Sequence, residues 1–509
     1  MFSAQPARRI NTSQLRSIVV VPSRTINKWH EPAAETQAYE ERLLCLLLGL
    51  SDPDLHVTYV TSSPIAPAIV DHYLSLLAPA RRRAARARLT LLSANDATSR
   101  PLSEKLLERP LLLHQIRRAI PDPQSCHLVP YTTTPLERDV ALELGIPMHG
   151  ADPRHAHLGT KSGCRELFAA AGVAHPLGVE HIYSVPAAID AIAGLRARKP
   201  EIQQLVMKLN EGVSGEGNAI VDLRGLPAPG ARAERAAISE RITGMALEAQ
   251  AVGLERYLGC LAAHGGIVEE RIVGAEVRSP SAQLEISAAG EVEIVSTHDQ
   301  LLGGASGQSY LGCRFPAEPA YARQIAELAQ RVGRRLAAAG VIGRSAIDFV
   351  AVRRDGGAWD AYAIELNLRK GGTTHPFAAL ALLTGGTYDM ASGTFATPAG
   401  AGKAYVATDH VEAPALRSLG CRGALSAIDR AGLRFEHQRE TGVVMHMLSS
   451  LDELGRAGLT AIGDEPSQAQ ALYDRAHEVL FEAAETAARR TLPRRLRPVA
   501  PAAELALAA

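Results

Sequence analysis

A short segment near residue 365 carries residue types that bind cations and phosphates. In "AIELNLRKGGTTHP" (363–376), alternation along an extended chain sends Glu365, Asn367 and Arg369 to one face. Carboxylate and amide oxygens suit Mg²⁺, and arginine suits a phosphate or a carboxylate. The preceding segment "AIDFV" would set Asp348 beside them if the two strands pair across a short turn. Such a cluster can bridge two divalent ions and nucleotide phosphates. The alternative is an exposed polar strand face with an ordinary salt bridge.

A lysine followed by a glycine-rich turn forms the second candidate. "KLNEGVSGEGNAIV" (208–221) places the turn directly after an apolar run. Glycines permit positive φ angles and let backbone N–H groups approach a phosphate closely. The sequence lacks the G-x-x-x-x-G-K-[ST] spacing of a Walker loop, and a plain hairpin turn is the alternative. The candidate nucleotide-binding residues here are Lys208, Gly212, Ser214, Gly215 and Gly217.

Further nucleotide candidates flank this loop on both sides in the sequence. Lys161 stands at the start of an expected helix and offers a second fixed positive charge. In "VEERIVGAEVR", the backbone from Glu269 to Ile272 could contact adenine, and Glu276 could accept hydrogen bonds from ribose hydroxyls. Taken alone, this segment is equally typical of an acidic strand edge.

A glycine-rich polar stretch, residues 296–313, is a candidate lining for an acceptor substrate. His298, Asp299 or Gln300 would face that substrate, although an ordinary connecting loop is the alternative. His375, just after the expected cation-binding strand, could face substrate or simply neighbour a helix cap.

Composition limits the remaining classes of function. The chain has 509 residues, so we expect roughly two to four domains. Its 54 Lys and Arg residues balance 54 Asp and Glu residues, which gives no field for nucleic acid or an acidic membrane. The six cysteines form no C-x-x-C pair, and no signal peptide or membrane-spanning run stands out. We therefore expect a protein of the reducing cytoplasm, without nucleic-acid or membrane partners.

Alternating patterns predict the elements that position these residues. "SIVVVPS", "HVTYVTS" and "RLTLLSAND" are expected strands with helices between them, which predicts a parallel α/β layer. That layer lacks G-x-G-x-x-G after its first strand and so has no dinucleotide fingerprint. From about residue 159, hairpins mix with helices, which favours α+β layers. After residue 402, the pattern predicts a compact strand–helix–strand–helix appendage and a Pro/Ala/Arg-rich tail.

The candidate residues follow one another in an order that resembles the ATP-grasp superfamily. The likeness spans about residues 158–384, and its E-x-N-x-R end is the most specific part. It implies ATP held between two α+β subdomains, a glycine-rich flap, and Mg²⁺ on Asp348, Glu365 and Asn367. Two ions are expected, with Mn²⁺ as an alternative. The lysines and Arg369 would complete the phosphate clamp, with Lys208 and Arg369 in catalytic roles.

A narrower likeness covers most of the chain. "YEERLL", "VTSSPIAP", "KLNEGVSGEGNA", "ELNLRKGGTTHPF" and "VVMHMLSSLDELGRAGLTAIGDEP" resemble the pheganomycin-type peptide ligases. The resemblance divides the chain into a Rossmann-like pre-ATP-grasp domain (1–150), a lid subdomain (151–270), a metal- and substrate-binding subdomain (271–400), a C-terminal appendage (401–490) and a flexible tail (491–509).

One position departs from the wider superfamily. Some ATP-grasp ligases have an arginine two residues before the metal-binding aspartate, where this chain has Ala346. Arg344 lies out of register, so Arg369 would take over the acyl-phosphate contact.

The resemblance implies an ATP-dependent carboxylate–amine ligase. It would form an amide through an acyl phosphate and release ADP and phosphate. A carboxylate–thiol ligase, a kinase or a non-catalytic ATP-binding module are the alternatives. The sequence leaves open the identity of both substrates and the oligomeric state, a homodimer included.

Overall fold

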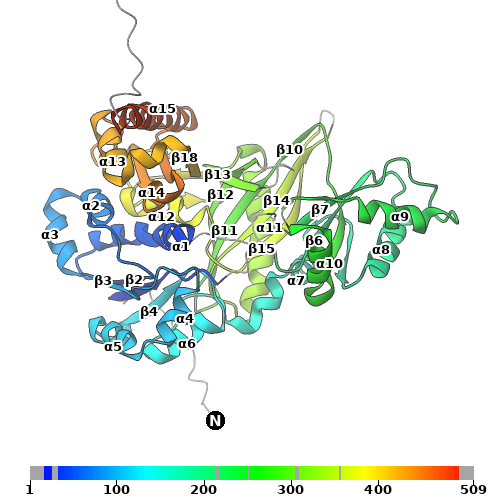
Figure 1. The fold of residues 1–509 in the computed structure, drawn as a ribbon, viewed down its shortest axis with the longest axis horizontal. Helices are drawn as coiled ribbons and strands as arrows, with labels where there is room; N and C mark the ends of the chain where they lie inside the picture. The colour runs from blue at the N-terminus through cyan, green and yellow to red at the C-terminus, as the bar shows by residue number, and fades with distance from the viewer. Residues whose placement is uncertain are drawn as a thin grey trace, which may run out of the picture.

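The computed structural model describes residues 16–25, 33–212, 215, 217–249, 252–303, 309–354 and 357–491. It contains a parallel sheet near the N-terminus, a smaller antiparallel sheet in the middle of the chain, and a large antiparallel sheet between them (Figure 1). This mixture of α/β and α+β parts confirms the predicted fold class. Within the described residues, no helix has both the length and the apolar character needed to cross a bilayer.

The N-terminal layer is built on four parallel strands in the order β3-β2-β1-β4. Their apolar, β-branched runs fit strands covered on both faces, because parallel sheets carry their crossover helices there. The predicted first helix begins as α1 and continues in the tighter 3₁₀ geometry of η2. The elements are β1 (Ser17–Val21), α1 (Ala33–Glu40), η2 (Glu41–Ser51), β2 (His56–Thr61), α2 (Pro67–Ser75), α3 (Pro79–Ala87), β3 (Leu89–Ser93), α4 (Leu102–Leu107), α5 (Pro110–Ala119), β4 (Cys126–Pro130) and α6 (Pro135–Leu144).

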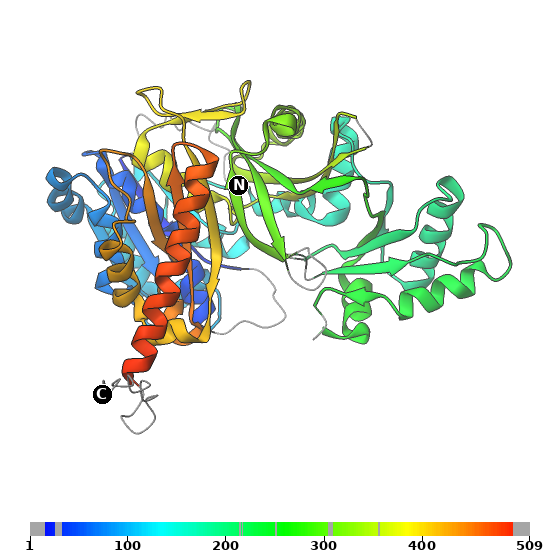
Figure 2. The same ribbon diagram turned by 90° about the horizontal axis from the view of Figure 1, so that it is seen from above.

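The middle of the chain forms a five-stranded antiparallel sheet in the order β5-β9-β6-β7-β8. Its helices pack on the sheet around a hydrophobic core of their own. In Figures 1 and 2 this unit stands out to one side of the molecule. Its elements are β5 (Gly178–Ile182), α8 (Val185–Arg198), β6 (Gln204–Leu209), β7 (Asn218–Asp222), α9 (Glu234–Thr243), β8 (Ala246–Leu247), α10 (Leu254–His264) and β9 (Gly266–Glu270); α7 (Lys161–Ala171) precedes them.

A nine-stranded sheet follows the path β10-β14-β11-β12-β13-β18-β20-β19, with β15 paired to β14. The long amphipathic helix α11 covers one part of it. Its elements are β10 (Glu276–Arg278), β11 (Pro280–Ile286), β12 (Val292–Gly303), β13 (Ser309–Phe315), α11 (Pro319–Ala338), β14 (Gly343–Arg353), β15 (Trp359–Asn367), α12 (Thr374–Thr384), β16 (Thr387–Asp389), β17 (Thr394–Ala396), β18 (Ala404–Glu412), α13 (Gly420–Arg430), β19 (Gly442–His446), α14 (Ser450–Leu454), β20 (Arg456–Gly463) and α15 (Pro466–Thr491).

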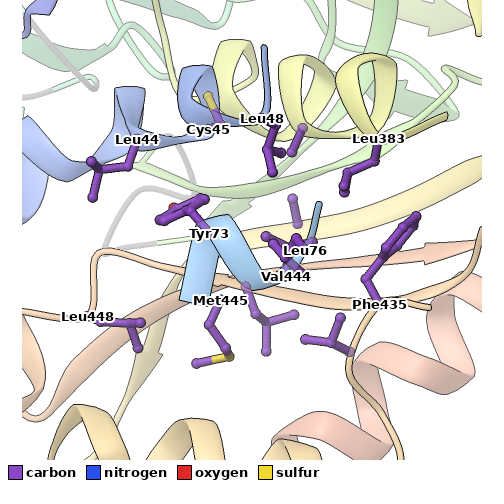
Figure 3. Close-up of a cluster of buried hydrophobic side chains, with 14 of the residues drawn as sticks. Leu44, Cys45, Leu48, Tyr73, Leu76, Leu383, Phe435, Val444, Met445 and Leu448 are labelled. Carbon is purple, nitrogen blue, oxygen red and sulfur yellow. The ribbon is translucent and has the colours of Figure 1, made fainter. Parts of the chain in front are cut away.

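The C-terminal strands β18, β19 and β20 are hydrogen-bonded into this sheet. β18 pairs with β13, so the sheet continues across the expected division at residue 400. Side chains from η2 and α2 share one buried cluster with the C-terminal strands, as Figure 3 shows for Leu44, Tyr73, Val444 and Met445. The sequence pattern could not show this packing, because it joins segments as distant as His72 and Met445, which are 373 residues apart.

Candidate functional site

A polar cavity of about 360 Å³ lies where the three parts of the chain meet. The nine-stranded sheet contributes the side chains of Asp348, Glu365 and Asn367, and Arg369 follows directly after β15. Gly215, from the hairpin loop of the middle sheet, also lines it. The structure therefore brings together the predicted cation ligands, the predicted arginine and one glycine of the predicted flap.

Strand pairing explains how the carboxylates meet. β14 and β15 are antiparallel, with Asp348 directly opposite Glu365 and Ala346 opposite Asn367. The side-chain N–H of Asn367 donates to Asp348 Oδ2 at 3.0 Å, and that of Gln300 donates to Asp348 Oδ1 at 2.7 Å. The contact of Asn367 uses its nitrogen, so the amide oxygen, which is the atom that binds cations, is not consumed by it.

The two carboxylates are electrostatically unequal. Burial, together with the neighbouring Glu365 charge, raises the pKa of Asp348 to about 6. Burial opposes ionisation of Glu365 as well, but Lys161, Lys208 and Arg369 together outweigh burial and lower the pKa of that carboxyl. Two adjacent acidic oxygens and an amide oxygen are the donor set that Mg²⁺ or Mn²⁺ prefers. The residues present fit a divalent cation.

Lys161 reaches this cluster from another element. Its Nζ lies 2.6 Å from Glu365 Oε1, and its side chain is 5 % exposed. It stands at the N-terminus of α7, which Asn210 ties to the end of β6: Asn210 Oδ1 accepts from the backbone N–H and hydroxyl of Ser162. Asn210 was not among the predicted residues, although its position just before the glycine loop is a usable signal.

Lys208 lies in a second buried charge cluster. Its Nζ is 2.6 Å from Glu269 Oε1, and Arg165 holds the other carboxylate oxygen at 2.7 Å. Glu269 is on β9, which pairs with β6 next to Lys208. The Glu269 side chain therefore holds the side chains of Lys208 and Arg165, and its backbone lies within β9, one residue before that strand ends.

The predicted hairpin joins β6 to β7 and carries the glycine loop. Gly215 has a φ of +82°, a conformation that favours glycine. A Cβ on Gly212 would lie 3.3 Å from the Cα of Gly217, so the two backbones approach closely. Ser214, the remaining candidate of the loop, lies outside the described residues.

Two adenosine candidates lie away from the cavity lining. Ile272 is half-buried in the segment between β9 and β10. Glu276 pairs with Arg278 and Arg353, both at 2.5 Å.

Arg344 pairs with Glu285 at 2.8 Å and is absent from the cavity lining.

The stretch 296–313 divides into structural and cavity residues. Gln300 lines the cavity, as do Ser309 and Leu311. His298 is buried and lies 2.6 Å from the hydroxyl of Tyr405, and Asp299 accepts from the Tyr321 hydroxyl at 2.6 Å. Of the three predicted acceptor residues, only Gln300 is in position to meet a ligand; residues 304–308 lie outside the described chain.

His375 belongs to a buried cluster that could be taken for a metal site. His375 Nε2 and His446 Nδ1 lie 3.3 and 3.5 Å from Asp409 Oδ1. However, Arg42 already pairs with Asp409 Oδ2. Burial raises the pKa of Asp409, but Arg42 together with His375 and His446 outweighs burial and holds that pKa well below its usual range. A divalent cation would place further positive charge beside a buried arginine, which is costly. We interpret the cluster as a support for Arg42.

The sequence reasoning missed the wall that the N-terminal layer contributes to the cavity. Arg24, Glu35, Tyr39, Arg42 and Tyr131 line it. Tyr39 and Arg42 belong to the segment "YEERLL", but nothing in that segment indicates that it faces residues of β14 and β15.

Two family models match the chain. The model described as "IQCH-like, ATP-grasp" matches residues 153–244 and 252–391. The model described as "PGM1 C-terminal domain" matches residues 424–476.

Two curated proteins are similar in sequence. The L-propargylglycine--L-glutamate ligase of Streptantibioticus cattleyicolor is 30 % identical over 456 residues, which cover 87 % of this chain and 89 % of that protein. The IQ motif-containing protein H of Danio rerio is 26 % identical over 388 residues, which cover 67 % of this chain and only 36 % of that protein.

Solved structures share the fold at low sequence identity. An N5-carboxyaminoimidazole ribonucleotide synthetase in complex with ADP has a TM-score of 0.52 at 10 % identity, covering 92 % of this chain and 98 % of that chain. A biotin carboxylase from Campylobacter jejuni has a TM-score of 0.54 at 13 % identity, covering 93 % of this chain and 96 % of that chain.

Proposed function

The chain belongs to the ATP-grasp family of carboxylate–amine ligases, and on this premise we propose that it joins two amino acids, or an amino acid and a short peptide. The name of the 30 % identical ligase from Streptantibioticus cattleyicolor, which pairs two amino acids, supports this substrate class. The observation that carries the proposal is the single cavity that gathers Asp348, Glu365, Asn367 and Arg369 beneath the glycine loop.

We assign cation binding to Asp348, Glu365 and Asn367. Their oxygens would hold two Mg²⁺ ions, with Mn²⁺ as an alternative. When bound, such ions neutralise charge on the transferring phosphoryl group. Gln300 and the amide nitrogen of Asn367 orient Asp348 for this task through their hydrogen bonds.

We assign the phosphates of ATP to Lys161, Lys208 and Arg369. The lysines are held by Glu365 and Glu269, so their charges are already in place before ATP arrives. Preorganised charge of this kind requires no rearrangement during the reaction. The backbone of 269–272 would contact adenine, and Glu276 would exchange an arginine partner for ribose hydroxyls. The glycine loop, Ser214 included, would close over the phosphates.

The reaction follows in two steps. A carboxylate oxygen of the first substrate attacks the γ-phosphorus of ATP, and the bond to the bridging oxygen breaks, which releases ADP. The amine of the second substrate then attacks the acyl carbon, loses a proton, and displaces inorganic phosphate. Closure of the loop would exclude water. This exclusion matters because water hydrolyses an acyl phosphate easily.

We further propose that the protein acts in the reducing cytoplasm. All six cysteines are free thiols, and four of them are buried. Free buried thiols are typical of proteins that fold where disulfides do not persist. We keep the five-part division of the chain as a working description for truncation experiments.

Substrate-dependent ADP release tests the function. Purified protein with Mg²⁺–ATP is offered pooled amino acids and short peptides, and products are identified by mass spectrometry. We expect ADP together with a product lighter than its parents by one water. ADP without such a product would favour a kinase or a thiol ligase, and ATP binding without any ADP would favour a binding module.

A further inference from the structure

The wall from the N-terminal layer is rich in guanidinium groups. The Cζ atoms of Arg24 and Arg42 each lie 3.8 Å from the centroid of the Tyr39 ring. Both arginines are buried, with 7 % and 6 % of their surface exposed, and both line the cavity that holds Asp348 and Glu365. Two guanidinium groups that pack on one ring gather positive charge at this wall of the cavity, which favours an anionic ligand.

Arg42 is held in a fixed orientation. It donates to the Tyr131 hydroxyl at 2.9 Å and pairs with Asp409, whose other oxygen faces His375 and His446. Such support locks the guanidinium without any ligand, which is the arrangement expected of a preorganised binding site.

Two acids near this wall have arginine partners. Glu35 lines the same cavity, but it pairs with Arg456 at 2.7 Å. Asp409 is balanced by Arg42. The acids opposite, Asp348 and Glu365, face the expected cation site. Arg24 and Arg42 would therefore attract a substrate carboxylate, whereas Asp348 and Glu365 would repel it.

The proposed ligase handles two kinds of carboxylate. One is activated beside the γ-phosphate and is consumed. An amine-bearing amino acid brings another, which must stay unreacted and away from ATP while its amine reaches the acyl carbon. A fixed carboxylate also fixes the nearby amine, which favours attack.

We propose that Arg24, Arg42 and Tyr39 form the binding site for the unreacted carboxylate of the amine-bearing amino acid. This assignment rests on the proposed function and names a substrate subsite within it. Arg24 supplies a guanidinium for the carboxylate, Arg42 supplies a second one held by Asp409, and Tyr39 keeps the two in place.

Steady-state kinetics with the amino-acid pair found by ADP release test this site. We expect Arg24→Gln to raise KM for the amine-bearing amino acid by about 100-fold, the loss expected for two charge-assisted hydrogen bonds. Arg24→Lys should raise this KM by less, because lysine keeps the positive charge. KM for ATP should stay within about twofold. Arg109→Gln is the matched control, because Arg109 pairs with Asp96 in the same layer and is absent from the cavity lining.

Two carboxylates could occupy this site: that of the amine-bearing amino acid, or a spare carboxylate of the acyl donor. Replacing each one in turn by a carboxamide shows which of them the site binds. Wild-type protein should disfavour the α-carboxamide of the amine-bearing amino acid by about 100-fold, and Arg24→Gln should show almost no preference. An unchanged KM in Arg24→Gln would overturn the proposal. A different result is that Arg24→Gln loses the preference for carboxylate over carboxamide only at a spare carboxylate of the acyl donor. That result would overturn the assignment to the amine-bearing substrate.

Calorimetry keeps this test separate from the proposed function. If no amino acid supports ADP release, the ligase proposal fails, but wild-type and Arg24→Gln protein can still be titrated with L-glutamate and its α-carboxamide. A wild-type preference for glutamate that Arg24→Gln removes would support a carboxylate site. No preference would overturn it.

Discussion

At the scale of single residues, Glu365 connects the proposed cation ligands to Lys161, which we assign to phosphate binding. It stands opposite Asp348 across β14 and β15 and pairs with Lys161 at 2.6 Å. Glutamine has nearly the same shape but lacks the charge that both roles need. We therefore expect Glu365→Gln to reduce kcat for ADP release by at least about 100-fold.

The matched control is Glu293→Gln, because Glu293 is exposed on β12 and is absent from the cavity lining. Circular dichroism and thermal unfolding should show both variants folded. A folded Glu365→Gln variant with wild-type turnover would remove Glu365 from the catalytic centre.

His72 provides a residue-scale test of burial between distant segments. It lies on α2, and its Nε2 is 3.1 Å from the backbone oxygen of Met445 on β19. Burial lowers its pKa from 6.5 to about 4. Between these values the unfolded chain binds more protons than the folded one, so this group's contribution makes stability rise with pH up to about 6.5.

The substitution His72→Gln removes this titration and keeps a side-chain N–H for Met445. Relative to wild type, the variant should gain about 1.4 kcal/mol in free energy of unfolding when the pH falls from 7.5 to 5.5. Urea unfolding at both pH values measures the difference. His114→Gln, at an exposed position of α5, should show no such gain.

At the scale of elements, we propose that the β6–β7 hairpin acts through its backbone, whose N–H groups would contact the phosphates of ATP. Gly215 lines the cavity and has a φ of +82°. A Cβ in that conformation costs about 1–2 kcal/mol, so alanine would displace the loop from the position in which we propose that it closes over phosphate. We expect Gly215→Ala to lower kcat by roughly tenfold at saturating ATP.

Gly259→Ala is the control within the same unit. Gly259 lies in α10, and no atom lies within 4 Å of a Cβ added there. This substitution should leave turnover unchanged and stabilise the helix slightly. Equal turnover in both variants would show that the conformation of residue 215 does not limit the reaction.

At the scale of the whole molecule, local patterns predicted the strands but not their assembly. Alternation placed Glu365 and Asn367 on one face, and the glycine spacing placed a hairpin after Lys208, because both signals act over a few residues. The arginine wall depends on contacts such as Arg42 with Asp409, 367 residues apart. No periodicity encodes a contact of that separation, and the same reason hid the union of the C-terminal strands with the nine-stranded sheet.

The Arg42–Asp409 pair joins the N-terminal layer to β18 and also shapes the cavity, so stability and function can be separated there. Both side chains are buried, with 7 % and 4 % exposed. Asp409→Asn should lower the free energy of unfolding by about 3–5 kcal/mol, because it leaves a guanidinium buried without its counter-charge.

The double variant Arg42→Met with Asp409→Leu removes both charges at once. Its loss of stability should be smaller than the sum of the two single losses, since neither partner is left alone. If Arg42 also binds substrate, the double variant should regain stability without regaining a wild-type KM for the amine-bearing amino acid. Four proteins are compared: wild type, Arg42→Met, Asp409→Leu and the double variant. Urea unfolding measures their stability, and ADP-release kinetics measure their KM for the amine-bearing amino acid. Recovery of KM together with stability would reduce Arg42 to a structural residue, whereas additive losses would mean that the pair does not couple the two parts of the chain.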